Sequence, residues 1–492
     1  MTMAGSATGE IRDDVSRFLG IPYASAPAGS RRWRPPVAPA PWPGGCDCLS
    51  FGPDCPQSSI PFFGEKPGRM AEDNCLTLNV WTPADRQSSA LPVLVWLHGG
   101  GFIAGAAARP WYDGAGLARR GAVVVTLNYR LGVLGFLAHP ALTAENPEAP
   151  ANWGLQDQIA ALRWVRDNIQ AFGGDPGCVT ILGQSAGAVS VYALMSSPAA
   201  AGLFHRASAL SGAPPRELVS LAEAEASGIQ LATRLGVAGT DDLALRALRG
   251  CSCAELLAAI NEEGAPFLPG DGTRRWLCAD GQILPSSPLS VFRAGSQISV
   301  PLLAGTVADE GTVFVRRMPE FSLEEWRNLL ARRFGGRASE AEMLWPAASP
   351  EETRGAYAAL LGDGFVAGTR LAVRSQSRIQ PRAFLYQFAH RRESRNPAVR
   401  DLGCFHGAEV PYVLGAFGRG AAALSEADRR LAERMQDFWL RFACTGDPND
   451  PDLPAWPAWN DASDVHLEMA AGFRTVSGLR RPQCDFLEQT WR

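Results

Sequence analysis

The chain has 492 residues, of which 46% are hydrophobic and 20% charged, and its formal net charge at pH 7 is −4. This is the composition of an ordinary globular protein that can bury a large core. The slight negative charge gives no reason to expect nucleic acid or an anionic membrane surface as a partner. The apolar runs are too short to span a bilayer, and no basic cluster with a following apolar run opens the chain. We therefore expect a cytoplasmic protein without stable membrane insertion.

Strands are predicted along most of the chain, where short β-rich runs alternate with helical patterns. Segments 35–56 and 61–68 are rich in proline and glycine and indicate surface loops near the N-terminus. The alternation predicts an α/β fold with a mainly parallel sheet covered by helices. The predicted strands are 93–98, 122–128, 179–183, 207–211 and 301–305, with 383–388 and 465–469 as later candidates.

Two helices have clear patterns. In segment 155–171 the apolar residues recur at spacings of 4, 3, 3 and 4, which places them on one helical face, and the segment ends at a Gly-Gly-Asp-Pro stop. A second helix is predicted at 426–443. Residues 322–361 resemble several helices with little strand character. We expect one domain over residues 1–492, with a helical cap or inserted subdomain at about 313–380.

Ser185 is the candidate nucleophile. It lies in the motif GQSAG at 183–187, which follows the apolar strand 179–182 and precedes a segment suited to a helix. Strand, tight turn and helix form the context of a nucleophile elbow, in which small neighbours are needed because the serine is forced out at the tip of the strand. The alternative is an ordinary strand-to-helix turn with a capping serine.

An oxyanion hole is predicted upstream, because strand 93–97 leads into HGGGF at 98–102. Consecutive glycines allow backbone N–H groups to converge on a developing oxyanion. The candidate donors are Gly100, Gly101 and Ala186. A flexible glycine turn or a phosphate loop is less favoured, since no lysine follows and the GxGxxG pattern is absent.

A serine needs a base, and the base needs an orienting acid. Of the six histidines, His406 differs because it lies in GCFHG at 403–407, a late loop, where an α/β-hydrolase has its base. The acid is expected between Ser185 and His406 after a strand. Strand 301–305 is followed by TVADEG, so by spacing alone either Asp309 or Glu310 could hold the imidazole. An exposed acidic turn is the alternative.

At this point the chain resembles the type-B carboxylesterase family of the α/β-hydrolase fold, and in length the bacterial para-nitrobenzyl esterases. The resemblance covers almost the whole chain. It rests on motifs in family order: FLGIPYA at 18–24, CLTLNV at 75–80, HGGGF at 98–102, NYR at 128–130, GGDP at 173–176, GQSAG at 183–187, DEG at 309–311, HG at 406–407 and TGDP at 445–448.

The resemblance implies roles for further residues. It selects Glu310 as the acid and supports the three oxyanion donors. It places Ser211 and Gln184 near the site, and it implies a buried structural ion pair between Arg130 and Asp157.

Cysteines raise two further questions. Family members often join the cysteines that match Cys55 and Cys75, but the extra Asn74 changes the loop, so this disulfide is left open. The CxC pairs at 46–48 and 251–253 are weak metal signals, because no pair of CxxC motifs has zinc-ligand spacing. We expect mostly reduced thiols and no metal.

Substrate charge is inferred from two departures from cholinesterases. Segment 55–75 lacks their tryptophan and contains only Phe62 and Phe63 as aromatic residues, and Gln184 replaces their glutamate before the serine. Both changes remove features that attract cations, which argues against choline esters and for neutral ones. The candidate pocket walls are Phe102, Trp111, Phe62 and Phe314.

The sequence thus predicts a serine hydrolase that cleaves small-molecule carboxylic esters through an acyl-enzyme, without metal or organic cofactor. An amide or carbamate hydrolase would use the same residues. Non-catalytic adhesion relatives typically lack the nucleophile, and no long amphipathic lid indicates a lipase. We expect a monomer or small homo-oligomer.

Overall fold

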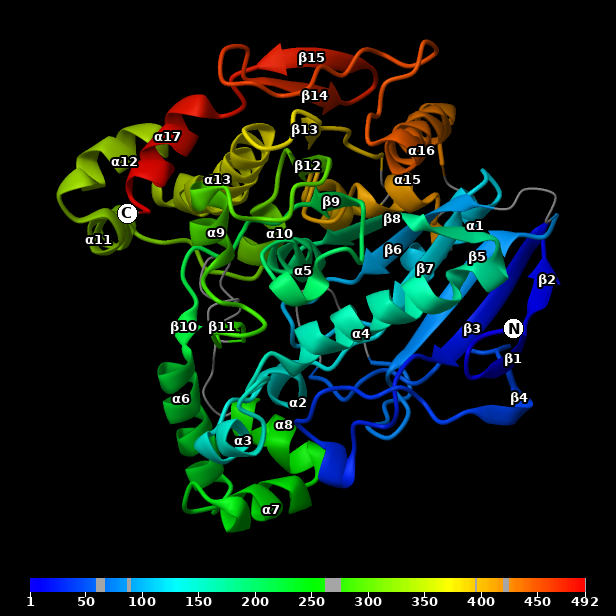
Figure 1. Ribbon diagram of the computed structural model, residues 1–492. Helices are drawn as coiled ribbons and strands as arrows, with labels where there is room; N and C mark the ends of the chain where they lie inside the picture. Colours follow the sequence, from blue (N-terminus) through cyan, green and yellow to red (C-terminus); the bar gives the residue numbers. More distant parts are fainter. Residues whose placement is uncertain (59–66, 86–89, 262–275, 394–395, 419–423, 492) are drawn as a thin grey trace.

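A computed structural model describes residues 1–58, 67–85, 90–261, 276–393, 396–418 and 424–491. An 11-stranded sheet forms its centre (Figure 1). From one edge to the other the strands are β15 (Phe473–Ser477), β14 (Val465–Met469), β13 (Ala383–Phe388), β12 (Leu302–Val307), β9 (Arg206–Leu210), β8 (Gly174–Gln184), β6 (Leu91–Leu97), β7 (Val123–Leu127), β5 (Thr77–Pro83), β3 (Val15–Pro22) and β2 (Glu10–Arg12).

The sheet is parallel from β14 to β7 and antiparallel at both edges. Its centre is fully buried: Val95 pairs with Val125 on one side and Ile181 on the other, and none of the three is exposed. Such continuous apolar strands are typical of parallel sheets covered on both faces. The α/β fold predicted from the sequence is confirmed.

Helices cover both faces of the sheet. The cluster that includes Val93 and Val95 packs against α4 (Trp153–Asn168), α5 (Ala186–Met195) and α13 (Pro350–Ser377). The cluster on the other face includes Leu94 and Trp96 and packs against α15 (Val410–Leu414) and α16 (Glu426–Thr445). Because successive strand residues point to opposite faces, one strand contributes to both clusters.

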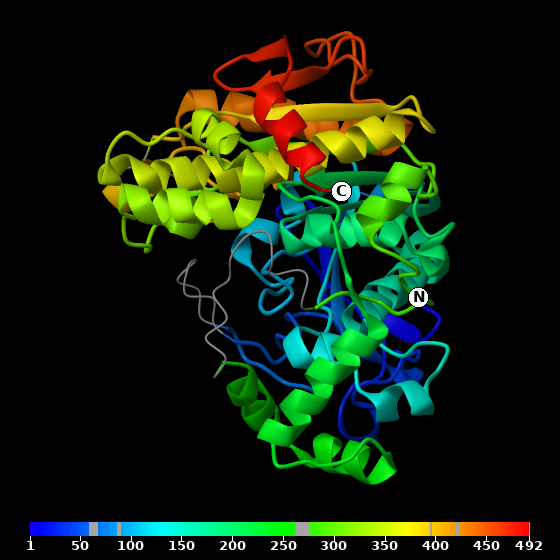
Figure 2. The same ribbon diagram turned by 90° about the vertical axis from the view of Figure 1, so that its left-hand side faces the viewer.

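Two groups of shorter helices lie beside the sheet (Figures 1 and 2). One group shares its own apolar cluster and contains α2 (Gly132–Phe136), α3 (Pro140–Glu145), α6 (Leu221–Arg234), α7 (Asp242–Gly250) and α8 (Cys253–Asn261). The other contains α10 (Thr312–Val315), α11 (Leu323–Phe334), α12 (Ala338–Leu344) and α17 (Arg481–Gln489), next to α13. Residues 322–361 are therefore helical, as the sequence predicts. Among the described residues, no helix is both long and apolar enough to cross a membrane.

The predicted strands and helices are present with shifted ends, and some strands were not predicted. Strand β8 begins at Gly174, before the predicted start at 179, because its ladder with β6 extends back to the pairing of Gly174 with Leu91. The expected loop at 35–56 contains β4 (Trp42–Asp47), which pairs with β1 (Gly5–Thr8). Strands β2, β3 and β5 at one edge of the sheet and β15 at the other also escaped prediction.

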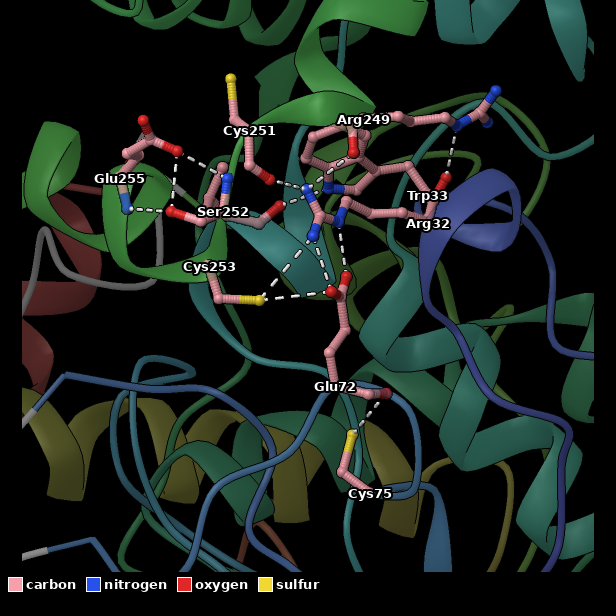
Figure 3. A network of polar contacts seen from close by, with 10 residues as sticks. Arg32, Trp33, Glu72, Cys75, Arg249, Cys251, Ser252, Cys253 and Glu255 are labelled. Carbon is pink, nitrogen blue, oxygen red and sulfur yellow. Dashed lines mark hydrogen bonds and ion pairs between the residues drawn. The ribbon is translucent and has the colours of Figure 1, made fainter.

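A buried arginine joins the N-terminal segment to the α7–α8 turn (Figure 3). The guanidinium of Arg32 forms two bonds to the Glu72 carboxylate, at 2.5 and 2.6 Å, and a third to the carbonyl of Cys251 at 2.5 Å. The thiol of Cys253 donates to Glu72 at 3.3 Å. Burial and the Glu72 carboxylate raise the pKa of Cys253 to about 12, so its thiol stays protonated. This CxC pair therefore takes part in a structural network.

Candidate active site

Ser185 lies between β8 and α5, at the carboxyl edge of the sheet. Its backbone has φ 59° and ψ −124°, a strained conformation that is held by a 3.0 Å bond from its N–H to the carbonyl of Leu210. A Cβ on Gly187 would lie 2.0 Å from the carbonyl oxygen of Leu97, so only glycine fits after the turn. The structure thus forms the strand, tight turn and helix of a nucleophile elbow.

The glycine loop packs directly against this elbow. A Cβ on Gly99 would lie 3.1 Å from the Cβ of Ser185. The loop turns at Gly100, whose carbonyl accepts from two following N–H groups and whose φ is 118°. Within the described part of the chain, the N–H groups of Gly100 and Gly101 have no protein acceptor. The N–H of Ala186 belongs to the first turn of α5, where helical N–H groups have no intrahelical partner.

Glu310 and His406 meet beside the elbow. Oε2 of Glu310 lies 2.5 Å from Nδ1 of His406, and both side chains are 1% exposed. The other carboxylate oxygen accepts from the N–H of Val307 at 2.9 Å, which fixes the carboxylate plane. In the described residues, Nε2 of His406 is buried without a partner. The adjacent Gly407 lies against Gln184, because a Cβ there would be 3.5 Å from the Gln184 amide nitrogen.

Asp309, the other acid allowed by spacing, points away from the imidazole. Its carboxylate accepts from the N–H of Cys404 at 2.8 Å and its own N–H donates to the Cys404 carbonyl at 2.9 Å. Arg391 binds the same carboxylate at 3.0 Å. Thr312 adds a bond to the carbonyl of Leu402 at 2.8 Å. These bonds join the loop that carries the acid to the loop that carries the histidine.

Two phenylalanine rings that stack on each other both pack against His406. The ring centroids of Phe314 and Phe365 each lie 5.1 Å from the imidazole, and the two rings are parallel within 6°. Phe314 was a predicted wall residue. Phe365, in the middle of α13, was not predicted, because nothing in the pattern of a long helix distinguishes it.

The other predicted wall residues are placed differently. Phe102 has a ring that is 1% exposed and packs edge-to-face on Phe136 at 5.2 Å, so it belongs to the core beside the glycine loop. Trp111 packs with Tyr112 on the face of the sheet that carries α16. Phe62 lies outside the described residues.

Ser211 and a glutamate that the sequence did not predict form a buried pair close to the triad candidates. The hydroxyl of Ser211 donates to Glu409 at 2.6 Å, and the second Glu409 oxygen is buried without a partner among the described residues. Burial and the charge of Glu310 raise the pKa of Glu409 to about 7. The sequence feature that could have pointed to Glu409 is its position three residues after His406.

Cys55 and Cys75 are buried free thiols in this structure, and the Cys55 thiol points toward the Cys75 carbonyl at 3.9 Å. The pair implied by the resemblance, Arg130 and Asp157, is buried and bidentate, with bonds of 2.7 and 2.8 Å. No group of three or more His, Cys, Asp or Glu side chains that could hold a metal ion occurs in the parts of the chain described above.

The chain matches known proteins over nearly its whole length. A family model, the carboxylesterase family, matches residues 2–487. A fumonisin B1 esterase of Sphingopyxis macrogoltabida is 37% identical over 91% of this chain and 82% of its own. A para-nitrobenzyl esterase of Bacillus subtilis (strain 168) is 35% identical over 91% of this chain and 90% of its own. A solved structure of a PNB esterase aligns with a TM-score of 0.84 at 32% identity, covering 100% of this chain and 99% of that one.

Fold and comparisons agree on the class of protein, which is an α/β-hydrolase. The chain belongs to the carboxylesterase family. It is a carboxylic ester hydrolase, and its substrate is a small-molecule ester.

Proposed function

We propose that Ser185, His406 and Glu310 are the nucleophile, base and acid of this hydrolase. His406 takes the proton of Ser185 as the serine oxygen attacks the ester carbonyl. Gly100, Gly101 and Ala186 donate to the oxyanion. The tetrahedral intermediate collapses, His406 gives the proton to the leaving alcohol, and the acyl group stays on Ser185. Water, deprotonated by the same histidine, then releases the acid.

The observation that carries this proposal is the buried contact between Glu310 and His406, next to the elbow. A carboxylate at 2.5 Å from Nδ1 requires the proton on that nitrogen, so Nε2 is left as the acceptor that a serine hydroxyl needs. The adjacent N-terminus of α5 and the open N–H groups of the glycine loop supply donors for the charge that develops on the substrate.

We further propose that the ester is neutral. Gln184 lies beside the nucleophile and carries no charge, and its amide nitrogen is buried without a partner in the described residues. A cationic substrate would gain no carboxylate from this position. The relatives' printed names include a fumonisin B1 esterase, a para-nitrobenzyl esterase and an acetylcholinesterase of Bungarus fasciatus at 33% identity. The uncharged Gln184 argues against the cationic choline esters of the last kind.

We propose that residues at about 313–380 act as a helical cap within one domain. This region contributes both rings that pack against His406, Phe314 from α10 and Phe365 from α13. Cap helices that contact the base would couple the walls of the substrate pocket to the catalytic histidine.

Matched substrates test the proposal. A neutral p-nitrophenyl ester, its p-nitroanilide and a choline ester of the same acyl group should be hydrolysed in that order of kcat/KM. Ser185→Ala should lose all hydrolysis while keeping the wild-type Tm. A higher kcat/KM on the anilide would favour an amidase, and a higher kcat/KM on the choline ester would refute the preference for neutral substrates. Undiminished hydrolysis by Ser185→Ala would refute the assignment of the nucleophile.

A further inference from the structure

Gln57 makes contacts with the glycine loop that the mechanism above does not use. Its side chain is 4% exposed and lies two residues after Cys55. The carboxamide oxygen accepts from the N–H of Gly105 at 2.8 Å, and the amide nitrogen donates to the Gly105 carbonyl at 2.9 Å. The same nitrogen donates to the Cys55 carbonyl at 3.0 Å. The buried amide therefore has a partner at both of its polar atoms.

Gly105 is the end of the loop that carries the candidate oxyanion donors. A Cβ at Gly105 would lie 2.4 Å from the carbonyl oxygen of Gly99 and 2.4 Å from Nδ1 of His98, so the two ends of the loop are in contact. Between them, Gly100 accepts from the N–H groups of Ile103 and Ala104. The loop is thus closed on itself, and a group that fixes Gly105 also fixes the residues before the donors.

A second buried side-chain amide binds the backbone just after Gly105. Asn128, 3% exposed, accepts from the N–H of Ala107 at 2.8 Å and donates to the carbonyl of Pro53 at 3.0 Å. Residues 53–57 are therefore linked to residues 105–107 twice, directly through Gln57 and indirectly through Asn128. Gln57 differs from Asn128 because its partner, Gly105, directly contacts the loop that contains Gly100 and Gly101.

We propose that Gln57 is a positioning residue for the oxyanion hole, holding the 99–105 loop so that the N–H groups of Gly100 and Gly101 face the carbonyl oxygen of the ester that Ser185 attacks. This inference rests on the proposed function, since it assigns those N–H groups to the oxyanion. Donors that act on developing charge must be held in place before the reaction, and a displacement of about 1 Å can cost about 100-fold in rate. Loss of the Gln57 bonds would leave Gly105 without its partners and free the loop to move.

The test is Gln57→Met, which keeps the approximate volume and removes both bonds to Gly105. The matched control is Gln297→Met. Gln297 is also 4% exposed and hydrogen-bonded, to Gln376 at 2.9 Å, but it precedes the amino end of β12, at the opposite end of the strand from Glu310. Gln57→Met loses three hydrogen bonds and should lower Tm at least as much as Gln297→Met, which loses one. Rates are expressed per active site, titrated with a fluorophosphonate.

We expect kcat of Gln57→Met on a neutral p-nitrophenyl ester to fall by about 10- to 100-fold, with KM within about threefold of wild type. Binding of a trifluoromethyl ketone, which forms a tetrahedral adduct with an oxyanion, should weaken by the same factor as kcat/KM. Gln297→Met should keep the wild-type kcat and inhibitor affinity. A kcat of Gln57→Met within twofold of wild type, or an equal loss in Gln297→Met, would overturn the proposal.

Gln57→Glu tests the same point if the methionine variant does not fold. The carboxylate can still accept from the Gly105 N–H but cannot donate to the Gly105 carbonyl, and protonation restores one donor. The ratio of its kcat to that of wild type should therefore rise as pH falls, whereas a ratio that is independent of pH and close to one would overturn the proposal. Both outcomes presuppose an active wild type. Failure of the proposed function would appear instead as a wild type that neither hydrolyses esters nor reacts at Ser185.

Discussion

Replacing Glu310 with glutamine tests the proposal that Glu310 orients His406 as the catalytic base. In the native protein one carboxylate oxygen accepts from the Val307 N–H at 2.9 Å and the other lies 2.5 Å from Nδ1 of His406. A glutamine can keep its oxygen on Val307 only by presenting its NH₂ group to His406. Nδ1 must then accept a hydrogen bond, so the ring proton moves to Nε2. A protonated Nε2 can no longer take the proton of Ser185.

The reverse orientation of the amide is no better. With its oxygen on His406, the amide would place its NH₂ group against the N–H of Val307, leaving two buried donors face to face. We therefore expect the wrong tautomer to dominate and the stabilisation of the imidazolium to be lost. A triad acid replaced by its amide loses about 10⁴-fold in kcat, equivalent to about 5.5 kcal/mol of transition-state stabilisation.

The assay is the kcat of Glu310→Gln per titrated active site on a neutral p-nitrophenyl ester, with Asp309→Asn as the comparison. Because Asp309 binds the backbone of Cys404 and not the imidazole, its amide can still accept from that N–H, and kcat should fall by much less. A loss below tenfold in Glu310→Gln, or a larger loss in Asp309→Asn, would refute the reasoning.

Two further predictions concern pH and stability. Burial and Glu310 raise the pKa of Glu409 from 4.5 to about 7 in the folded protein. Between these two pH values the folded protein keeps a proton on Glu409 that the unfolded chain has lost, so the free energy of unfolding falls as pH rises from about 4.5 to about 7. Urea unfolding at several pH values should show this fall in wild type and not in Glu409→Gln; an identical slope in both would contradict it. Asp157→Asn leaves Arg130 buried without its carboxylate and should lower the free energy of unfolding by about 3–5 kcal/mol. The control Glu342→Gln, which breaks an exposed ion pair, should cost less than about 1 kcal/mol, and equal losses would contradict the account.

The central sheet was predictable because most of its strands are continuous apolar runs, and β6 and β8 lead into glycine-rich turns. The antiparallel edge formed by β5, β3 and β2 was not predictable, since β5 buries polar side chains. Thr77, Asn79 and Thr82 are all at most 3% exposed, and the Asn79 amide is satisfied by Thr126 and by the N–H of Gly20. Sequence patterns treat such residues as solvent-facing, and only the paired strand shows where their hydrogen bonds go.

The candidate site was also predictable only in part. Glycine spacing singled out the turn at Ser185 and the candidate oxyanion loop, because those turns admit few other residues. Spacing could not choose between Asp309 and Glu310, which lie in one turn and point to different partners, and the choice came from family resemblance. Gln57 escaped notice because its main partner is the backbone of a residue 48 positions away, which leaves no side-chain pattern in the sequence.

Covalent labelling of Ser185 tests the central claim most directly. The native protein is treated with a fluorophosphonate, digested and mapped by mass spectrometry, with Ser185→Ala treated in parallel. The account predicts one phosphonylated peptide containing residues 183–187, with the adduct on Ser185, loss of esterase activity in proportion to labelling, and no adduct in Ser185→Ala. An adduct on another residue that accompanies the loss of activity, or an active protein that is never labelled, would contradict it.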